Sequence, residues 1–444
     1  MTASLSASSL LAPLAVFGSV LAVMVALNSG ATSPPVHSAG GNIGRPSGNP
    51  VRDAKMVVRA APESSSARAA LASAYLVRAR ESGDASLYAA AGRAVKAALT
   101  RDPRNVSALI GAATLAGLRH DFRGQLRYGL EAANVTPQLA SPLTVITDAQ
   151  LELGRYENAA RTVQRLVNLK PGLPAYARVS YYRELTGNPT GAVRAMRFAA
   201  SAGGSAQSAA YVRALLGDLE LARGHVVAAR SAYLDALRDV PSYPRALTGL
   251  ARIDVAGGDV GRAAALLRRS TRHLPLTTSL TLLGEVELAA RRNRAAAVHL
   301  DAARDMHAAE IAAGGLPDAE AVLFEANHGS PTKAVDLGRS VFRRAPSIRS
   351  ADALGWALTR AGAPARGLEW ARRALRTGSR DPLFRVHAAV AARRAGRRVA
   401  AERHERIATK GAAALSPALR AWLLQNGTNS PGATRSRSMP QPPV

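Results

Sequence analysis

One pair of residues in the sequence has the type and spacing for metal chemistry. Glu325 and His328, in the segment FEANHG, are three residues apart, so a helix would place both side chains on one face. Helix bundles bind metal ions with such pairs, but a dinuclear site needs a second pair and further carboxylates. The sequence has no second Glu-x-x-His. We therefore interpret His328, beside Gly329, as a polar residue at a helix end.

Other catalytic signatures are missing from the sequence. It contains no GxxxxGK[ST], no GxGxxG after a strand, no GxSxG and no HExxH. The absence of cysteine excludes disulfides, thiol catalysis, cysteine zinc sites and an anchor through a lipid-modified cysteine. We therefore predict a protein that is not an enzyme and that needs no cofactor or metal.

The charge of the chain is its strongest chemical signal. The net charge is +27, and Arg residues gather in short clusters. Such a charge results from solvated helix faces, or it attracts anionic partners such as acidic proteins, lipid head groups, cell-wall polymers or nucleic acid. Aromatic residues make up only 4% of the chain, which disfavours specific nucleic-acid binding through base stacking. The clusters are Arg268, Arg269 and Arg272; Arg291, Arg292 and Arg294; Arg372, Arg373 and Arg376; and Arg393, Arg394, Arg397 and Arg398.

Two residue patterns recur with the same period, and together they predict the helices that must position these residues. A Gly followed five residues later by a small residue recurs about every 34 residues, and a Pro follows twelve residues after the small position in most copies. A period of this length indicates stacked helix hairpins. The glycines are Gly154, Gly187, Gly224, Gly258, Gly329, Gly362 and Gly396; the prolines are Pro103, Pro137, Pro171, Pro241, Pro275 and Pro346.

The stretch from Pro142 to Pro171 shows how one unit works. Apolar residues on either side of Gly154 have helical i, i+3, i+4 spacing. Gly154 is placed where the first helix ends, Ala159 is small enough for the two helices to approach closely, and Pro171 stops the second helix. One hairpin cannot bury its apolar stripe alone, so neighbouring units must stack on it.

Several copies of the unit, taken together, carry a resemblance to a known family. The sequence resembles the tetratricopeptide repeat (TPR) family in the stretches LGRYENAA, RGHVVAARSAYLDALRDVP and GGDVGRAAALLRRSTRHLP. The resemblance implies an all-α, right-handed α-solenoid of about ten helix hairpins. Gln125 replaces the small residue in one copy, the turn Gly is missing near Arg292, and Gly203 and Gly204 replace a Pro. The stretch APSIRSADALGWALTRAGAPARGLEWARRALRTGSRDPLF is similar to the end of exported TPR proteins of high-GC bacteria, which implies export but no particular activity.

The TPR resemblance also predicts where a partner binds. First helices of TPR repeats line a concave groove, and transferring their exposed positions to this chain gives a set in which Arg outnumbers acid. We therefore expect a scaffold or adaptor that binds an acidic protein or peptide, and the alternative is a basic surface for anionic polymers, lipids or nucleic acid. Trp356 is equally well explained as a binding anchor and as core. The set is Asp148, Arg183, Tyr211, Asp218, Arg245, Arg252, Arg349, Asp352 and Trp356.

Composition divides the chain into four segments. Residues 1–31 hold an 18-residue apolar run, Leu10 to Leu27, and predict a cleaved signal peptide or a membrane anchor. We expect export or anchoring at the cell envelope; the lack of an early positive charge leaves an anchor with a cytoplasmic solenoid as the alternative. Residues 32–62 are a Pro/Gly/Ser-rich linker, 63–425 the solenoid with a joint near 314–317, and 426–444 a disordered tail. The oligomeric state does not follow from the sequence.

Overall fold

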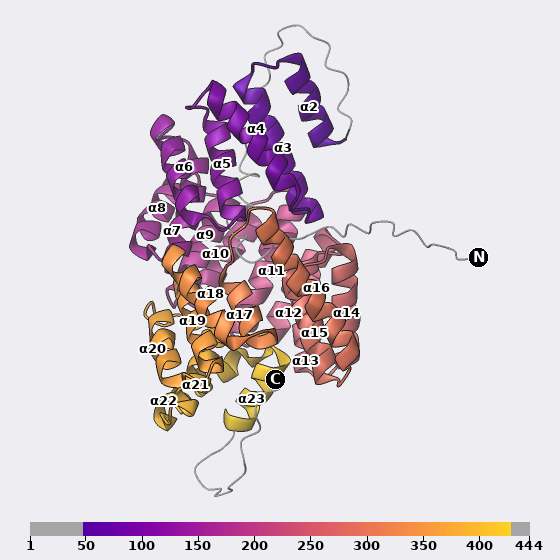
Figure 1. Cartoon of the computed structure of the whole chain (residues 1–444), viewed down its shortest axis with the longest axis vertical. Helices are drawn as coiled ribbons and strands as arrows, with labels where there is room; N and C mark the ends of the chain where they lie inside the picture. The colour runs from indigo at the N-terminus through magenta and orange to yellow at the C-terminus, as the bar shows by residue number, and fades with distance from the viewer. Residues whose placement is uncertain (1–47, 428–444) are drawn as a thin grey trace, which may run out of the picture.

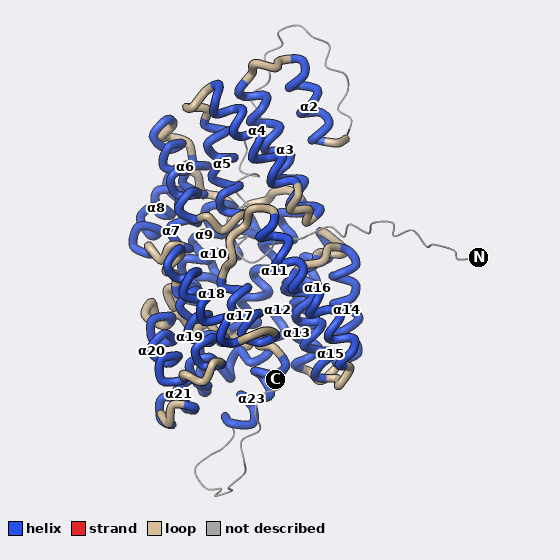
Figure 2. The backbone as a smooth tube through the Cα atoms, in the orientation of Figure 1, coloured by secondary structure: helices blue, strands red, loops and turns tan. Residues whose placement is uncertain are grey.

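The computed structural model describes residues 48–427, and within them all regular structure is helical, with no strand. Figures 1 and 2 show the helices stacked side by side along a curved path. The expected leader (1–31) and nearly all of the expected tail (426–444) lie outside the described residues. No helix of the described part combines the length and apolar character needed to cross a membrane.

The helices from α3 to α22 pack as consecutive antiparallel hairpins, each odd-numbered helix followed by its even-numbered partner. The first half of the array consists of α3 (Ser65–Ser82) and α4 (Leu87–Arg101), α5 (Val106–Leu118) and α6 (Phe122–Val135), α7 (Ala140–Glu152) and α8 (Tyr156–Leu169), α9 (Leu173–Leu185) and α10 (Pro189–Ser201), and α11 (Ala206–Ala222) and α12 (Val226–Asp239).

The second half consists of α13 (Pro244–Ala256) and α14 (Val260–His273), α15 (Thr277–Ala289) and α16 (Asn293–Ala312), α17 (Ala319–His328) and α18 (Pro331–Arg344), α19 (Ile348–Arg360) and α20 (Pro364–Ala374), and α21 (Pro382–Arg394) and α22 (Arg398–Ala408). A short 3-10 helix, η1 (Thr409–Ala414), and α23 (Pro417–Gly427) end the described chain. These hairpins make the fold a TPR-like α-solenoid.

The helix α2 (Pro50–Ala60) occupies the end of the segment that the sequence analysis takes for a linker. Asn49 caps it by accepting hydrogen bonds from the backbone N–H groups of Val51 and Arg52, and Pro50 has the fixed φ that suits a first helical position. None of its residues is buried, so α2 lies on the surface against α3. The linker boundary at residue 62 therefore needs correction, because capping signals outweigh the polar composition.

The turn inside nearly every hairpin holds a left-handed residue; the exception is the α17/α18 hairpin, where the expected turn glycine Gly329 has φ −135°. Gly154 has φ +69°, and the following Arg155 N–H bonds back to the Gln150 carbonyl at 2.8 Å, which ends α7. Two repeats without a turn glycine keep the same backbone, with His120 and Arg291 both at φ +58°. A left-handed side-chain-bearing residue costs about 1–2 kcal/mol. The turn geometry therefore persists in these repeats at a local energetic cost.

The solenoid curls until its second half lies against its first half (Figure 1). The Ile348 N–H donates to the Tyr156 hydroxyl at 2.9 Å, and the Thr377 hydroxyl donates to the Leu185 carbonyl at 2.6 Å. In each of these hydrogen bonds the two partners are 192 residues apart in the sequence, which corresponds to between five and six repeats of about 34 residues. One superhelical turn therefore closes after that many repeats, and we call the contact between successive turns the seam.

The seam continues in both directions from these contacts. The loop after α16, where the sequence analysis places a joint, docks on the end of α5: the Leu316 N–H bonds the Arg119 carbonyl at 2.9 Å, and His120 Nδ1 lies 2.9 Å from the Leu316 carbonyl. At the other end, Arg420 donates to the Ala256 carbonyl at 2.6 Å.

Glycines of the first superhelical turn also make the seam possible. A Cβ atom at Gly187 would overlap the Gly378 carbonyl oxygen and lie 2.7 Å from its carbon. Gly154 and Gly224 abut the carbonyls of Pro346 and Lys410 in the same way. The equivalent Gly396, in the last hairpin, has no atom within 4 Å of such a Cβ. The glycines of the first superhelical turn therefore have two roles. They adopt the left-handed conformation inside their hairpins, and they leave room for the backbone of the next superhelical turn.

Candidate binding channel

The first helices of the hairpins face a cavity. Most of its wall comes from the odd-numbered helices α3, α11, α13, α15, α17 and α19, as the TPR resemblance predicts for a concave side; His273 at the end of α14 and the loops around it complete the wall. Because these helices are distant in the sequence, the superhelical curl brings them together. The charged and phenolic residues of the wall are Arg80, Glu81, Tyr211, Tyr243, Arg245, Arg252, His273, Glu320 and Arg349.

The cavity holds more positive charge than its carboxylates neutralise. Nε and Nη1 of Arg80 are buried and have no hydrogen-bond partner in the described part of the chain. Arg252 makes no ion pair with any described carboxylate. Buried guanidinium groups without anions are costly, so an anionic group placed between them would be strongly favoured.

The other two Arg residues of the cavity are held by acids. Arg245 pairs with Asp218, and Arg349 lies 3.6 Å from Glu320. Arg245 keeps 44% of its side-chain surface exposed, and the residue lines the cavity. These cations are therefore oriented in advance and still accessible from the cavity.

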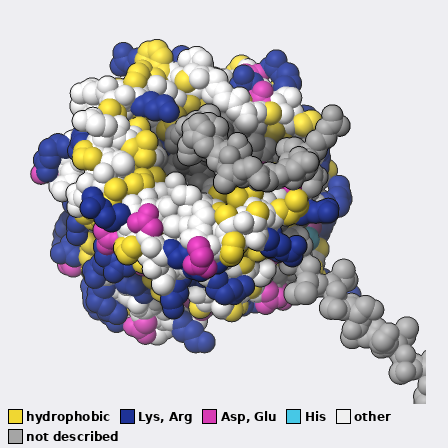
Figure 3. All heavy atoms as spheres, turned by 90° about the horizontal axis from the view of Figure 1, so that it is seen from above, with side chains coloured by type: hydrophobic (Ala, Val, Ile, Leu, Met, Phe, Trp, Pro, Cys, Tyr) yellow, Lys and Arg dark blue, Asp and Glu magenta, His cyan; other side chains and the backbone are white. Residues whose placement is uncertain are grey.

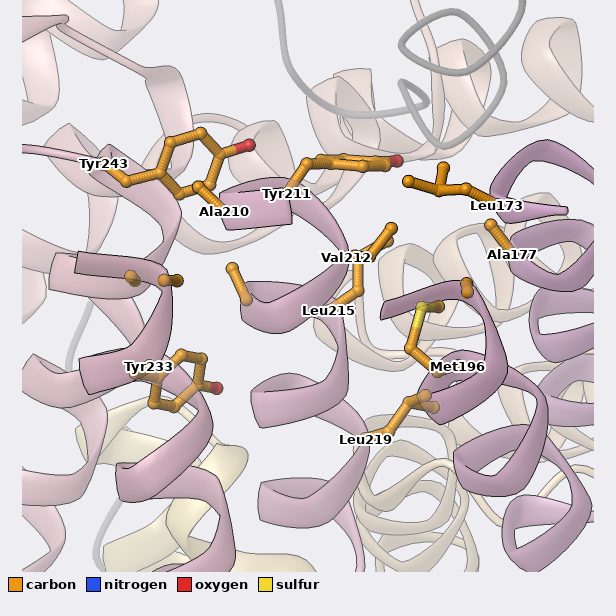
Figure 4. Packing of buried hydrophobic residues seen from close by; sticks show 14 of the residues in the cluster. Leu173, Ala177, Met196, Ala210, Tyr211, Val212, Leu215, Leu219, Tyr233 and Tyr243 are labelled. Carbon is orange, nitrogen blue, oxygen red and sulfur yellow. The ribbon is translucent and has the colours of Figure 1, made fainter. Parts of the chain in front are cut away.

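The orientation of Arg245 can be traced to the packing behind it. The Tyr233 hydroxyl donates to Asp218 at 2.7 Å, and the carboxylate then accepts from Arg245. The Tyr233 ring fits only because Gly217 and Gly249 flank it, since a Cβ at either position would overlap the ring. Figure 4 shows Tyr233 buried in the core cluster below Tyr211 and Tyr243. The Arg245 guanidinium is thus placed by a chain of contacts that starts in the core.

A second cavity lies beside the first. The two share Arg252, Thr278 and Glu320. The second is more apolar, with Leu282, Leu323, Phe324, Leu383 and Leu419 in its wall. We call the two cavities together the channel. It offers a cationic end and an apolar end to one extended ligand.

Burial shifts the pKa values of several side chains in the channel. Burial, followed by the charge of Asp318, raises the pKa of Glu320 to about 7. Burial lowers the pKa of the Arg80 guanidinium, but a guanidinium remains charged at neutral pH. Burial also raises the pKa of the Tyr211 and Tyr243 phenols, so both stay protonated. The channel therefore offers neutral donors and fixed cations, while its acid Glu320 titrates near neutrality.

The predicted groove residues divide into two groups. The structure brings Tyr211, Arg245, Arg252 and Arg349 together around the first cavity, with Asp218 behind Arg245. It does not bring Arg183 there: that side chain is half-buried and donates to the Gly191 carbonyl within its own hairpin.

The remaining three predicted residues are buried in the interior. Asp148 forms an ion pair of 2.6 Å with Arg178, whose side chain is fully buried. Asp352 Oδ2 accepts a hydrogen bond from His387 Nδ1 at 2.9 Å. The Trp356 ring stacks on His387, and its indole N–H donates to Asn327 at 2.8 Å. Trp356 is thus a core residue, one of the two interpretations that the sequence left open.

The Glu325/His328 pair is also separated by the structure. Glu325 accepts a hydrogen bond from the Ser330 N–H at 2.9 Å in the turn after α17, whereas His328 turns to Glu285 at 3.2 Å. No group of three or more His, Cys, Asp or Glu in residues 48–427 is placed to hold a metal ion.

Sequence reasoning missed Arg80, Tyr243 and Glu320 in the channel wall. Arg80 and Glu320 lie on first helices, which is the signal that would have found them. Tyr243 directly precedes α13, outside the helix positions that were transferred. Their convergence depends on the superhelical curl, which a repeat pattern in one unit does not specify.

Comparisons with known proteins add fold likenesses only. No protein-family model and no curated protein sequence matches the chain. The solved structures that it resembles include the human IFIT1 dimer with PPP-AAAA, at 14% identity and a TM-score of 0.48, covering 74% of this chain and 78% of that chain. A tetratricopeptide repeat protein from Parabacteroides merdae has 17% identity, a TM-score of 0.40 and coverages of 57% and 93%. The MamA protein has 16% identity, a TM-score of 0.30 and coverages of 38% and 92%. At these low identities and scores, the description of this chain as a TPR-like solenoid rests on its own hairpins.

Proposed function

We propose that this protein is a non-catalytic scaffold that binds an acidic segment of a partner protein in the channel. The proposal takes α3–α22 as about ten hairpins of one right-handed solenoid. The observation that carries it is the pair Arg80 and Arg252, two guanidinium groups that line one cavity and form no ion pair with a carboxylate of residues 48–427. Binding an anion there would satisfy donors that the folded chain leaves unmatched.

A protein segment fits the channel better than a compact anion. The cationic cavity and the apolar one share Arg252, Thr278 and Glu320, so carboxylates and apolar side chains of one extended chain would have separate, neighbouring places. The Tyr211 and Tyr243 hydroxyls are neutral donors suited to carboxylate or backbone oxygens. An acidic segment with an apolar residue nearby is therefore the ligand class that we propose.

The test uses two variants that each remove two positive charges. Arg80→Gln/Arg252→Gln changes the channel, whereas Arg272→Gln/Arg294→Gln changes exposed residues of the second helices or their turns. Wild type and the control should capture the same few acid-rich proteins in a crosslinked pull-down washed at high salt, and the channel variant should lose them. For a labelled oligo-aspartate peptide, each channel cation should contribute about tenfold in affinity, ~1.4 kcal/mol. Equal retention by both variants would remove the channel as the binding site.

Residues 1–31 support a second part of the proposal, that the solenoid is exported or anchored at the cell envelope, with a cytoplasmic-facing anchor as the alternative. Protease accessibility of residues 63–425 in intact cells and in spheroplasts decides between these orientations. Digestion only after lysis would place the solenoid inside.

A further inference from the structure

The last repeats carry a disproportionate share of the positive charge. Between residues 366 and 410 the chain has thirteen Arg or Lys and four Asp or Glu, a net charge of +9 out of +27. Two of the four acids are engaged locally: Glu405 accepts from both Nε and Nη2 of Arg393, and Glu402 pairs with Arg398. Lys and Arg side chains are also spread over the opposite end of the molecule, which Figure 3 shows from above.

Three of these cations converge at the boundary of α20, α21 and α22. Arg385 Nη1 lies 3.4 Å from His404 Nδ1, and its Nε is buried without a partner in the described chain. Arg372 and Arg403 are exposed and act on the same histidine: burial, then Arg385, Arg403 and Arg372, lower the pKa of His404 to about 4. The cluster is therefore a concentration of positive charge, and none of its three Arg residues forms an ion pair with a carboxylate of residues 48–427.

Arg385 connects this cluster to a hollow at the seam, because it also lines that hollow. Arg380 and Lys410 are exposed at the hollow and make no ion pair among the described residues, while Arg223 pairs with Glu220. Two acids also line it. Asp381 caps the start of α21 through the Leu383 N–H, and burial raises the pKa of Glu184 to about 7. The unpaired charge of the hollow is therefore cationic.

We propose that this basic seam site, comprising Arg372, Arg380, Arg385, Arg403 and Lys410, binds a flexible phosphate-bearing polymer. Several guanidinium groups spread over three helices match a chain of repeated phosphates better than a single anion. The hollow contains no Phe, Tyr or Trp, so it offers no stacking platform for nucleic-acid bases. Its concave shape admits a flexible chain, whereas a flat membrane surface would touch only the rim. This inference does not depend on the channel.

Labelled short-chain inorganic polyphosphate is the probe for this site, measured by fluorescence anisotropy at several salt concentrations. For wild type, the logarithm of the affinity should fall linearly with the logarithm of the salt concentration. The steepness of this line should decrease by about 1.5, the value for two lost phosphate contacts, in Arg380→Gln/Lys410→Gln and again in Arg372→Gln/Arg403→Gln. The control Arg272→Gln/Arg294→Gln and the channel variant Arg80→Gln/Arg252→Gln should bind as wild type does. Circular dichroism checks that each variant is folded.

A second readout is the histidine inside the cluster. Bound polyphosphate should raise the pKa of His404, followed by NMR, because phosphate offsets the field of the three Arg residues. Equal losses in the seam variants and the control, or an unchanged His404, would overturn the assignment. Binding to anionic vesicles but not to polyphosphate would replace the polymer with a lipid surface and would also refute it.

Discussion

Replacing a seam glycine by alanine tests whether successive superhelical turns touch. Gly187 and Gly396 occupy the same place in their repeats, with φ values of +80° and +72°. Gly396→Ala should cost about 1 kcal/mol, since it adds only a side chain at a left-handed position. Gly187→Ala also drives a Cβ into the Gly378 carbonyl. Relieving this overlap costs about 1–3 kcal/mol, and separating the seam also breaks the Thr377–Leu185 hydrogen bond, worth about 1 kcal/mol.

The free energy of unfolding of Gly187→Ala should thus fall about 2–4 kcal/mol further than that of Gly396→Ala. Urea titration followed by circular dichroism measures both changes, and the transition midpoints suffice if unfolding has more than one step. Small-angle scattering should show expansion of Gly187→Ala alone. Equal destabilisation of the two variants with unchanged scattering would mean that the turns do not meet in solution.

Three further predictions concern the core, a turn and the channel. Asp148→Ala should lower the free energy of unfolding by about 3–5 kcal/mol in urea titration, because it leaves Arg178 charged and buried, while Asp148→Leu/Arg178→Met should recover most of the loss. Arg291→Gly should raise it by about 1 kcal/mol, since glycine relieves the left-handed strain; no gain would argue against that strain. The affinity for oligo-aspartate should increase about two- to fivefold from pH 8 to pH 6, because Glu320, with a pKa of about 7, becomes neutral. The affinity of Glu320→Gln should change less over this range. Identical pH profiles for the two proteins would assign the effect to another group.

Local structure was well specified by the sequence, because the repeat signals act within one hairpin. Gly154 and Ala159 lie in the turn and in the close helix contact where their spacing predicts them. Arg291 shows that the turn survives without glycine, so the backbone arrangement is set by packing of the two helices as well as by the turn residue. The helix α2 was missed because its N-cap Asn49 is embedded in a segment of linker composition.

The channel was only partly predictable because it forms from distant repeats. Arg245, Arg252 and Arg349 were found by their place in a repeat, but the same rule also selected Asp148 and Asp352, which are buried in pairs with Arg178 and His387. Whether a first-helix side chain points into water or into the next repeat depends on its neighbour across the interface. The seam, which closes the channel, depends on the curl summed over several repeats and left no pattern within a single unit.

Site-specific photocrosslinking tests the proposed binding channel most directly. A photoreactive amino acid at Thr278, which lines both cavities, and one at the exposed Val298 of α16 would be compared in cells, with products mapped by mass spectrometry. We predict that Thr278 captures an acid-rich segment of a defined protein, that Val298 does not, and that Arg80→Gln/Arg252→Gln abolishes the product. A product that survives this double substitution, or that forms equally from Val298, would contradict binding of an acidic segment in the channel.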